Sequence, residues 1–312
     1  MGHEELVEWG RRLGELEPEL IIISNTSRCG STLLVQLAQS LCRPQQLAFA
    51  ETNSFDHADS LLRLNLPRAR VCELVAVTAK VLWNGRGLRT VVEKQRSVSI
   101  RTARLLHEAL PGRVKEVFIE RRDALATLRS LTQMSSGMMQ MRLFLAVLRP
   151  VCFLLRLLFR RHLGQGHLAK AAIQHLSGLS MDPELMLPLG RNFSQFSVFR
   201  VVAAVVANTL LTYQSHLPAF GERSMHVYLE ELLERPEEEL QRLATHCGLN
   251  PLAIPQAIHL MRRKHSQSES AALGRLRSYF QQAPVVTAEE RAETDAFWNE
   301  IGLEPLSWPH AS

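Results

Sequence analysis

The chain has 312 residues, enough to bury a hydrophobic core without the help of disulfides. Hydrophobic residues make up 46% and charged residues 21%, values that exclude a largely disordered or collagen-like chain. The 36 lysines and arginines exceed the 31 aspartates and glutamates by five, and this mild excess fits an anionic ligand or surface better than dedicated nucleic-acid binding.

The first elements follow the pattern of a parallel α/β sheet. Apolar residues at helical spacing predict a helix over 3–16, and the run Leu20–Ile23 predicts a strand buried on both faces. A polar turn at 25–32 leads into a second predicted helix over 33–41. A strand, a glycine-containing polar turn and a helix, in this order, form the opening unit of a parallel sheet.

Further elements repeat this alternation. Strands are predicted at Val91–Glu93, Val114–Ile119 and Met225–Tyr228. Helices are predicted over 99–110, from Ala124 onward, and over Pro236–Cys247 with Gly248 as the stop. We therefore expect a three-layer α/β fold, in which helices flank a parallel sheet, as one domain over 1–312 with a mostly helical insertion at 131–223.

One stretch departs from this pattern, because residues 124–181 contain seven basic residues and no carboxylate. Arg142, Arg149 and Arg156 recur every seven residues within an apolar background that is too short to cross a membrane. Two interpretations stay open. The segment is a buried helical hairpin whose arginines face a cleft or solvent, or it lies on an anionic membrane surface through 142–170.

The cysteines and the N-terminus predict the compartment. Five scattered cysteines without a CxxC pair indicate a reducing environment. Residues 1–20 are charged throughout and lack the apolar segment of a secretory signal, and Leu6 stands where a myristoylation signal has Ser or Thr. We expect a cytoplasmic protein, with peripheral membrane contact as the second possibility.

The polar turn after the first strand has the composition of a phosphate site. Backbone N–H groups at a helix N-terminus converge on an anion, and the helix dipole favours negative charge there. Gly30 allows close approach, Ser31 and Thr32 add hydroxyl donors, and Arg28 adds a fixed positive charge. Ser31 stands where a Walker A loop requires Lys. An ordinary strand-to-helix turn is the structural alternative.

Residues 26–34 resemble the 5′-phosphosulfate loop of the P-loop sulfotransferase family, nearer to its bacterial-type and carbohydrate branch than to its cytosolic branch. Members transfer a sulfuryl group from phosphoadenosine phosphosulfate (PAPS), and the resemblance implies a P-loop-type sheet. It also implies that PAPS is held by the loop residues Ser27, Arg28, Cys29, Gly30, Ser31 and Thr32.

A second element of the family is a strand ending in Arg, with Ser eight residues later. Arg122 and Ser130 have this spacing, and by resemblance they bind the 3′-phosphate. Arg121 leaves the register open by one residue, and Ala124 stands where many members have Pro. Near the C-terminus the resemblance carries over weakly to Lys264 and Ser266.

The resemblance also implies a mechanism that needs no metal. Arg28 holds phosphate and sulfate oxygens, Lys94 stabilises the leaving oxygen, and Glu51 is the base that takes the acceptor's proton, with His57 as the alternative. The dispersed histidines of the basic insertion form no tight ligand set, so metal binding is not expected. Because Cys29 lies beside Arg28 at a helix N-terminus, we expect a lowered thiol pKa.

Three functions are compatible with these residues. The first is a PAPS-dependent sulfotransferase acting on a small-molecule, glycan or lipid acceptor. The second is a small-molecule kinase, which the missing Walker lysine disfavours. The third is an inactive sulfotransferase-like fold that serves as a nucleotide-binding or membrane-peripheral module. The acceptor would be selected by 131–223, whose apolar and basic character suggests a lipophilic acceptor.

Overall fold

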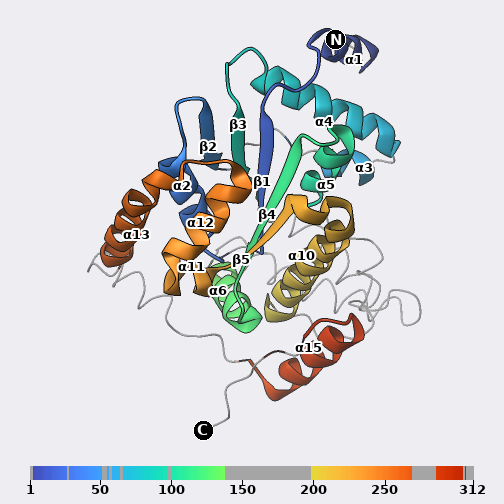
Figure 1. The fold of residues 1–312 in the computed structure, drawn as a ribbon. Helices are drawn as coiled ribbons and strands as arrows, with labels where there is room; N and C mark the ends of the chain where they lie inside the picture. Colours follow the sequence, from blue (N-terminus) through green and yellow to red (C-terminus); the bar gives the residue numbers. More distant parts are fainter. Residues whose placement is uncertain are drawn as a thin grey trace, which may run out of the picture. The chain divides into compact units, whose positions relative to one another are not determined.

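The computed structural model of the chain describes residues 3–26, 28–50, 55, 58–63, 66–96, 100–137, 198–268, 286–304 and 306 (Figure 1). The chain forms two compact units. The first unit comprises Met1–Arg122 and Thr212–Ser268, and the second comprises Asp123–Leu211 and Glu269–Ser312. The sequence-based division, one domain with an insertion at 131–223, stays a prediction.

A five-stranded parallel sheet forms the centre of the first unit. Its strands are β1 (Glu19–Asn25), β2 (Gln46–Ala50), β3 (Thr90–Lys94), β4 (Val114–Glu120) and β5 (Ser224–Tyr228). Their order in the sheet is β2-β3-β1-β4-β5, so that β1 is the central strand (Figure 1). This arrangement confirms the predicted α/β class and its parallel sheet.

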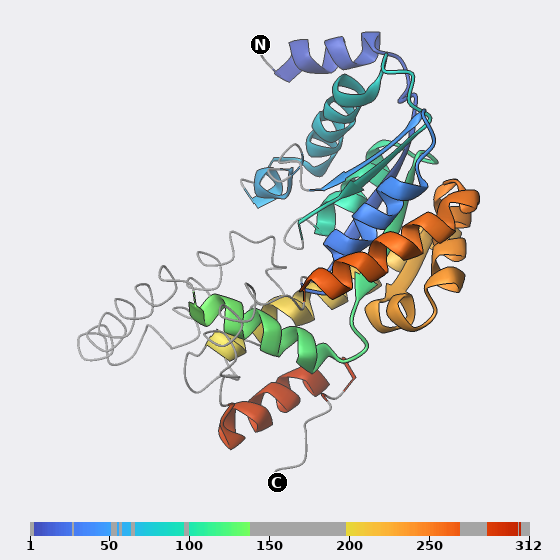
Figure 2. The same cartoon turned by 90° about the vertical axis from the view of Figure 1, so that its left-hand side faces the viewer.

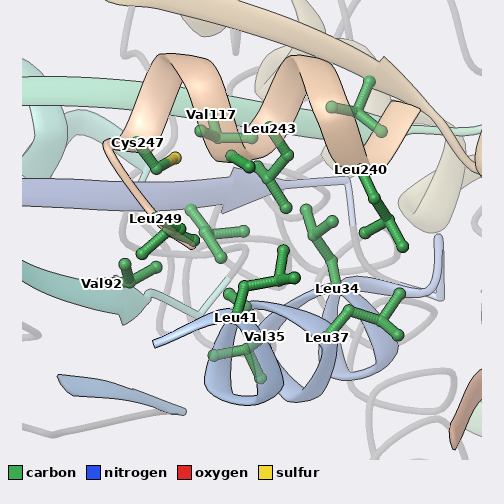
Figure 3. Close-up of a cluster of buried hydrophobic side chains, with 14 of the residues drawn as sticks. Leu34, Val35, Leu37, Leu41, Val92, Val117, Leu240, Leu243, Cys247 and Leu249 are labelled. Atoms are coloured by element: carbon green, nitrogen blue, oxygen red, sulfur yellow. The ribbon is translucent and has the colours of Figure 1, made fainter. Parts of the chain in front are cut away.

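Helices cover both faces of this sheet (Figure 2). The first unit contains α1 (His3–Arg12), α2 (Ser31–Leu41), α3 (Ala58–Arg63), α4 (Arg68–Trp83), α5 (Ile100–Ala109), α11 (Leu229–Glu234), α12 (Pro236–Cys247), α13 (Ile254–Ser268) and the final residues of α10 (Val198–Phe220). Leucines of α2 and α12 meet in one core cluster, where Figure 3 shows Leu34, Leu37 and Leu41 opposite Leu240 and Leu243. The other face packs against α4 and α5.

The apolar run of β1 follows from its central place. Side chains alternate across a strand, so Ile21 and Ile23 join the core cluster with α2, while Leu20 and Ile22 join the cluster with α4 and α5. All four residues are fully buried. A strand covered on both faces therefore reads as a continuous hydrophobic run, as the sequence predicted.

Helix boundaries follow the local sequence signals. The prediction of Pro236–Cys247 is confirmed residue for residue, because Pro236 occupies the first turn and Gly248 ends the helix in a left-handed conformation, with φ 63°. The N-terminal helix is shorter than predicted, since it ends at Arg12 and Gly14 takes φ 73° two residues later.

A buried polar cluster lies on the sheet face opposite α2. Glu116 of β4 is fully buried and accepts a hydrogen bond from Ser24 Oγ at 2.6 Å. His216 of α10, also buried, places Nδ1 3.5 Å from the second carboxylate oxygen. Beside them the ring of Tyr213 stacks on Phe118 at a centroid distance of 3.8 Å. Burial raises the pKa of Tyr213 to about 12, so this phenol stays neutral.

The described part of the second unit is helical. It contains α6 (Ala124–Gly137), the N-terminal part of α10 and α15 (Ala288–Glu300). Arg200 of α10, only 4% exposed, pairs with Glu293 of α15 at 2.6 Å. Thr287 and Glu290 form a reciprocal capping box at the start of α15. Within the described residues, none of the helices has the length and apolarity needed to cross a membrane.

Candidate phosphate-binding site

Parallel strands bring their carboxyl ends to one edge of the sheet, where open α/β folds bind ligands. In the first unit this edge is formed by Asn25 of β1, Lys94 of β3, Glu120 of β4 and Tyr228 of β5. Residues 26–32, here called the phosphate loop, connect the central strand to α2. The predicted motif thus follows the central strand of the sheet, at the edge formed by the carboxyl ends of the strands.

Gly30 shapes the phosphate loop at the start of α2. It is the N-cap residue, with φ 81° and ψ 12°, and no side chain of the described residues caps the helix from this position. A helix N-terminus of this kind carries backbone N–H groups without intrahelical partners, and such groups can bind an anion. A Cβ atom at Gly30 would lie 2.5 Å from Cδ1 of Leu229, so glycine is required both for the conformation and for the close contact.

Cys29 is a packing residue of the loop, which corrects one expectation. Its side chain is fully buried and Sγ donates to the carbonyl oxygen of Ile119 at 3.1 Å. Burial raises the pKa of the Cys29 thiol, whereas the sequence predicted that Arg28 and the helix dipole would lower it. The reason is that the thiol is buried in the core beside β4, whereas Arg28 is exposed.

The polar residues of the loop divide between surface and interior. Arg28 and Thr32 are exposed, and Ser31 is buried at the first turn of α2. Arg28 has φ 52°, a left-handed conformation that is uncommon for a residue with a side chain. Its carbonyl oxygen accepts a hydrogen bond from Nε of Arg121 at 3.1 Å. The sequence left open whether Arg121 or Arg122 matches the arginine of the family's second element. In the structure Arg121 contacts the loop directly.

Lys94 ends β3 next to the central strand. It lies in register with Ile23 of β1 and is only 4% exposed. It shares a sheet face with Val92, which packs in the cluster containing α2, so strand alternation places Lys94 on the α2 face. Asn25 Nδ2 donates to the carbonyl oxygen of Gln95 at 3.0 Å, and this bond ties the ends of β1 and β3 together.

Arg122 follows β4 and faces the residues after β5. Its side chain forms an ion pair with Glu231, and its backbone N–H donates to Glu230 Oε2 at 3.0 Å. Its guanidinium carbon lies 5.3 Å from the ring centroid of Tyr228. The sequence alone predicted no role for Glu230 or Glu231.

The remaining predicted residues lie elsewhere in the chain. Ser130 is on α6 in the second unit. Lys264 and Ser266 are positions of α13. Ser27, Glu51, His57 and the basic segment 142–170 lie outside the described residues, so the proposed base and the membrane contact stay predictions. In the part of the chain that the structure describes, no three His, Cys, Asp or Glu side chains group as metal ligands would.

Comparisons with known proteins give a limited result. No family model and no curated protein matches the chain. Among solved structures, a sulfotransferase domain from the curacin biosynthetic pathway is similar at 12% identity and a TM-score of 0.46, over 94% of this chain and all of that chain. A sulfotransferase from Alicyclobacillus acidocaldarius is similar at 14% identity and a TM-score of 0.37, over 75% of this chain and 82% of the other. At these values function has to be inferred from the residues of this chain.

Proposed function

We propose that this protein is a sulfotransferase that takes a sulfuryl group from PAPS. The observation that carries the proposal is the start of α2, where the N-cap residue is Gly30, which has no side chain to cap the helix, at the carboxyl end of the central strand. Arg28 follows β1 in the chain, and Lys94 ends β3, the strand that pairs with β1. Helix N–H groups together with fixed cations form a donor set for phosphate and sulfate oxygens, and the loop sequence resembles that of the sulfotransferase family.

Each residue of the site has a defined task in this proposal. When bound, PAPS supplies the activated sulfuryl group. The N–H groups of residues 30–32 and the guanidinium of Arg28 hold its 5′-phosphosulfate. Lys94 neutralises the charge that develops on the bridging oxygen as its bond to sulfur breaks and a new bond to the acceptor oxygen forms. Glu51 takes the proton of the acceptor hydroxyl, as the resemblance implies.

A kinase would use the same kind of loop differently. Walker A enzymes place a lysine directly after the last glycine, where it reaches the terminal phosphates of ATP. This chain has Ser31 at that position, and the lysine at the same edge of the sheet is Lys94 at the end of β3. We therefore expect the site to prefer a 3′-phosphorylated adenosine nucleotide over ATP.

Calorimetric titration with 3′-phosphoadenosine 5′-phosphate (PAP) tests the nucleotide site. Arg28→Ala removes a charge-assisted contact worth about 1.5–3 kcal/mol, so PAP affinity should fall roughly 10- to 150-fold. Arg43→Ala is the matched control, since Arg43 is an exposed arginine just beyond the other end of α2. It should leave PAP affinity unchanged. A failure of the wild-type protein to bind PAP, or ATP bound more tightly than PAP, would refute the proposal.

Turnover separates an enzyme from a binding module with the same fold. The expected result is release of PAP from PAPS together with sulfation of an acceptor, in a panel that includes lipids, glycans and small phenols and amines. Lys94→Ala should lower the rate far more than it lowers PAP affinity, because it acts on charge that develops only during transfer. PAP binding without turnover on any acceptor would favour the inactive module.

A further inference from the structure

The two arginines after β4 have different partners. Arg121 is held against the phosphate loop by its bond to the carbonyl oxygen of Arg28. Arg122 pairs with the carboxylate of Glu231 on α11. By the resemblance, Arg122 binds the 3′-phosphate of the nucleotide. In the structure this arginine pairs with a carboxylate of the protein itself.

A carboxylate and a phosphate use the same donors of a guanidinium group. The side chain of Arg122 is 57% exposed, while that of Glu231 is only 15% exposed. The arginine therefore lies at the surface, within reach of an incoming anion, and the carboxylate lies behind it. A phosphate that takes the full donor fork of Arg122 has to displace Glu231.

The surroundings allow this exchange to happen without leaving a charge isolated. Glu231 also lies 3.5 Å from Nη2 of Arg235, so it keeps a cationic partner when Arg122 turns away. The backbone N–H of Arg122 is bound separately by Glu230. The main chain after β4 can thus stay in place while the side chain of Arg122 changes partners.

We infer that Glu231 is a specificity-determining residue that competes with the 3′-phosphate for Arg122. This inference rests on the proposed function. The competition lowers the affinity for nucleotides that carry a 3′-phosphate, because part of their binding energy is used to release Arg122. It leaves nucleotides that occupy only the phosphate loop unaffected. Glu231 therefore limits how strongly the site prefers PAP over adenosine 5′-phosphate.

The test is titration of the full chain with PAP and with adenosine 5′-phosphate. In Glu231→Gln the PAP affinity should rise about 1.5- to fivefold, the range expected for loss of a partly exposed ion pair, and adenosine 5′-phosphate affinity should not change. Arg235→Gln should weaken PAP binding about two- to threefold, since Glu231 then depends on Arg122 alone. Glu234→Gln removes the same charge from an exposed position of α11 and should change neither affinity.

A double variant and the alternative outcomes make the test decisive. In Arg122→Ala the Glu231→Gln change should have no effect on PAP binding, because the contested cation is gone. Weaker PAP binding in Glu231→Gln would show that Glu231 holds Arg122 in place for the ligand, and would overturn the inference. If Glu231→Gln changed the affinities for PAP and adenosine 5′-phosphate equally, or changed neither, the inference would also be overturned. The proposed function would still be upheld in that case, provided that the wild-type protein binds PAP. Binding of PAP by neither protein would overturn both.

Discussion

Replacing Gly30 with Ala tests the geometry of the phosphate loop. Gly30 has φ 81°, in the left-handed region, and its missing Cβ would lie 2.5 Å from Cδ1 of Leu229. Leu229 is itself buried, at 8% exposure, at the start of α11. The substitution therefore adds backbone strain and forces the leucine side chain to move.

The two effects have separate magnitudes. A left-handed conformation costs a residue with a Cβ about 1–2 kcal/mol. Displacing the Leu229 side chain from its preferred rotamer costs about 0.5–1.5 kcal/mol more. We expect Gly30→Ala to lower the free energy of unfolding by about 1.5–3.5 kcal/mol in total and to weaken PAP binding, because the first turn of α2 shifts.

The assay is urea denaturation followed by circular dichroism, with two comparisons. Gly85→Ala is the control, since Gly85 has φ 73° and no atom within 4 Å of its missing Cβ, so only the backbone cost of about 1–2 kcal/mol applies. In a Leu229→Ala background the cost of Gly30→Ala should fall to the same value. An equal cost for Gly30→Ala in both backgrounds would refute the predicted contact, and a cost below about 0.5 kcal/mol would refute the left-handed conformation.

Three further predictions concern groups outside the nucleotide contacts. The buried thiol of Cys29, whose pKa is raised, should resist iodoacetamide at pH 8 in the folded protein and react only in urea. Peptide mass spectrometry measures the labelling, and rapid labelling of the folded chain would contradict this assignment. Burial lowers the pKa of His246, so the unfolded chain binds the proton more readily than the folded chain. The free energy of unfolding should therefore fall as the pH drops through 6.5, and His246→Gln should reduce this fall. An unchanged dependence on pH in His246→Gln would rule out the assignment. Glu293→Gln breaks the ion pair with the nearly buried Arg200 and should lower the free energy of unfolding of the second unit by about 3 kcal/mol. Urea unfolding followed by the fluorescence of the buried Trp298 measures this loss. An unchanged urea midpoint of unfolding would show that the pair contributes nothing.

The sequence was most informative where local chemistry decides the structure. The run Leu20–Ile23 is typical of a strand with both faces covered, and Pro236 with Gly248 marks both ends of α12. In contrast, β2 (Gln46–Ala50) contains no β-branched residue and is only partly buried at the edge of the sheet. Its sequence therefore lacks the composition typical of a strand. Its place beside β3 depends on the whole sheet and cannot be read from five residues.

For the candidate site, the sequence points to the loop after the central strand but not to the side-chain partners around it. The loop is contiguous in sequence, so its glycine and hydroxyl residues at a strand-to-helix turn are enough to make it a candidate. The partners of Arg121 and Arg122 were not predictable, because they depend on which way each side chain points after β4 ends at Glu120. Glu231 is distant in sequence and reaches Arg122 only because β5 pairs with β4.

The strand order also has a consequence for synthesis on the ribosome. The strand β5 begins at residue 224, which is 104 residues after β4 ends at residue 120. At about 5–20 residues per second, roughly 5–20 s of translation separate the two strands. During this interval β4, whose residues are mostly buried in the finished sheet, has no β5 to pair with its outer edge. An unpaired apolar edge is prone to join other chains, so the emerging protein should depend on chaperones until residue 228 has been made.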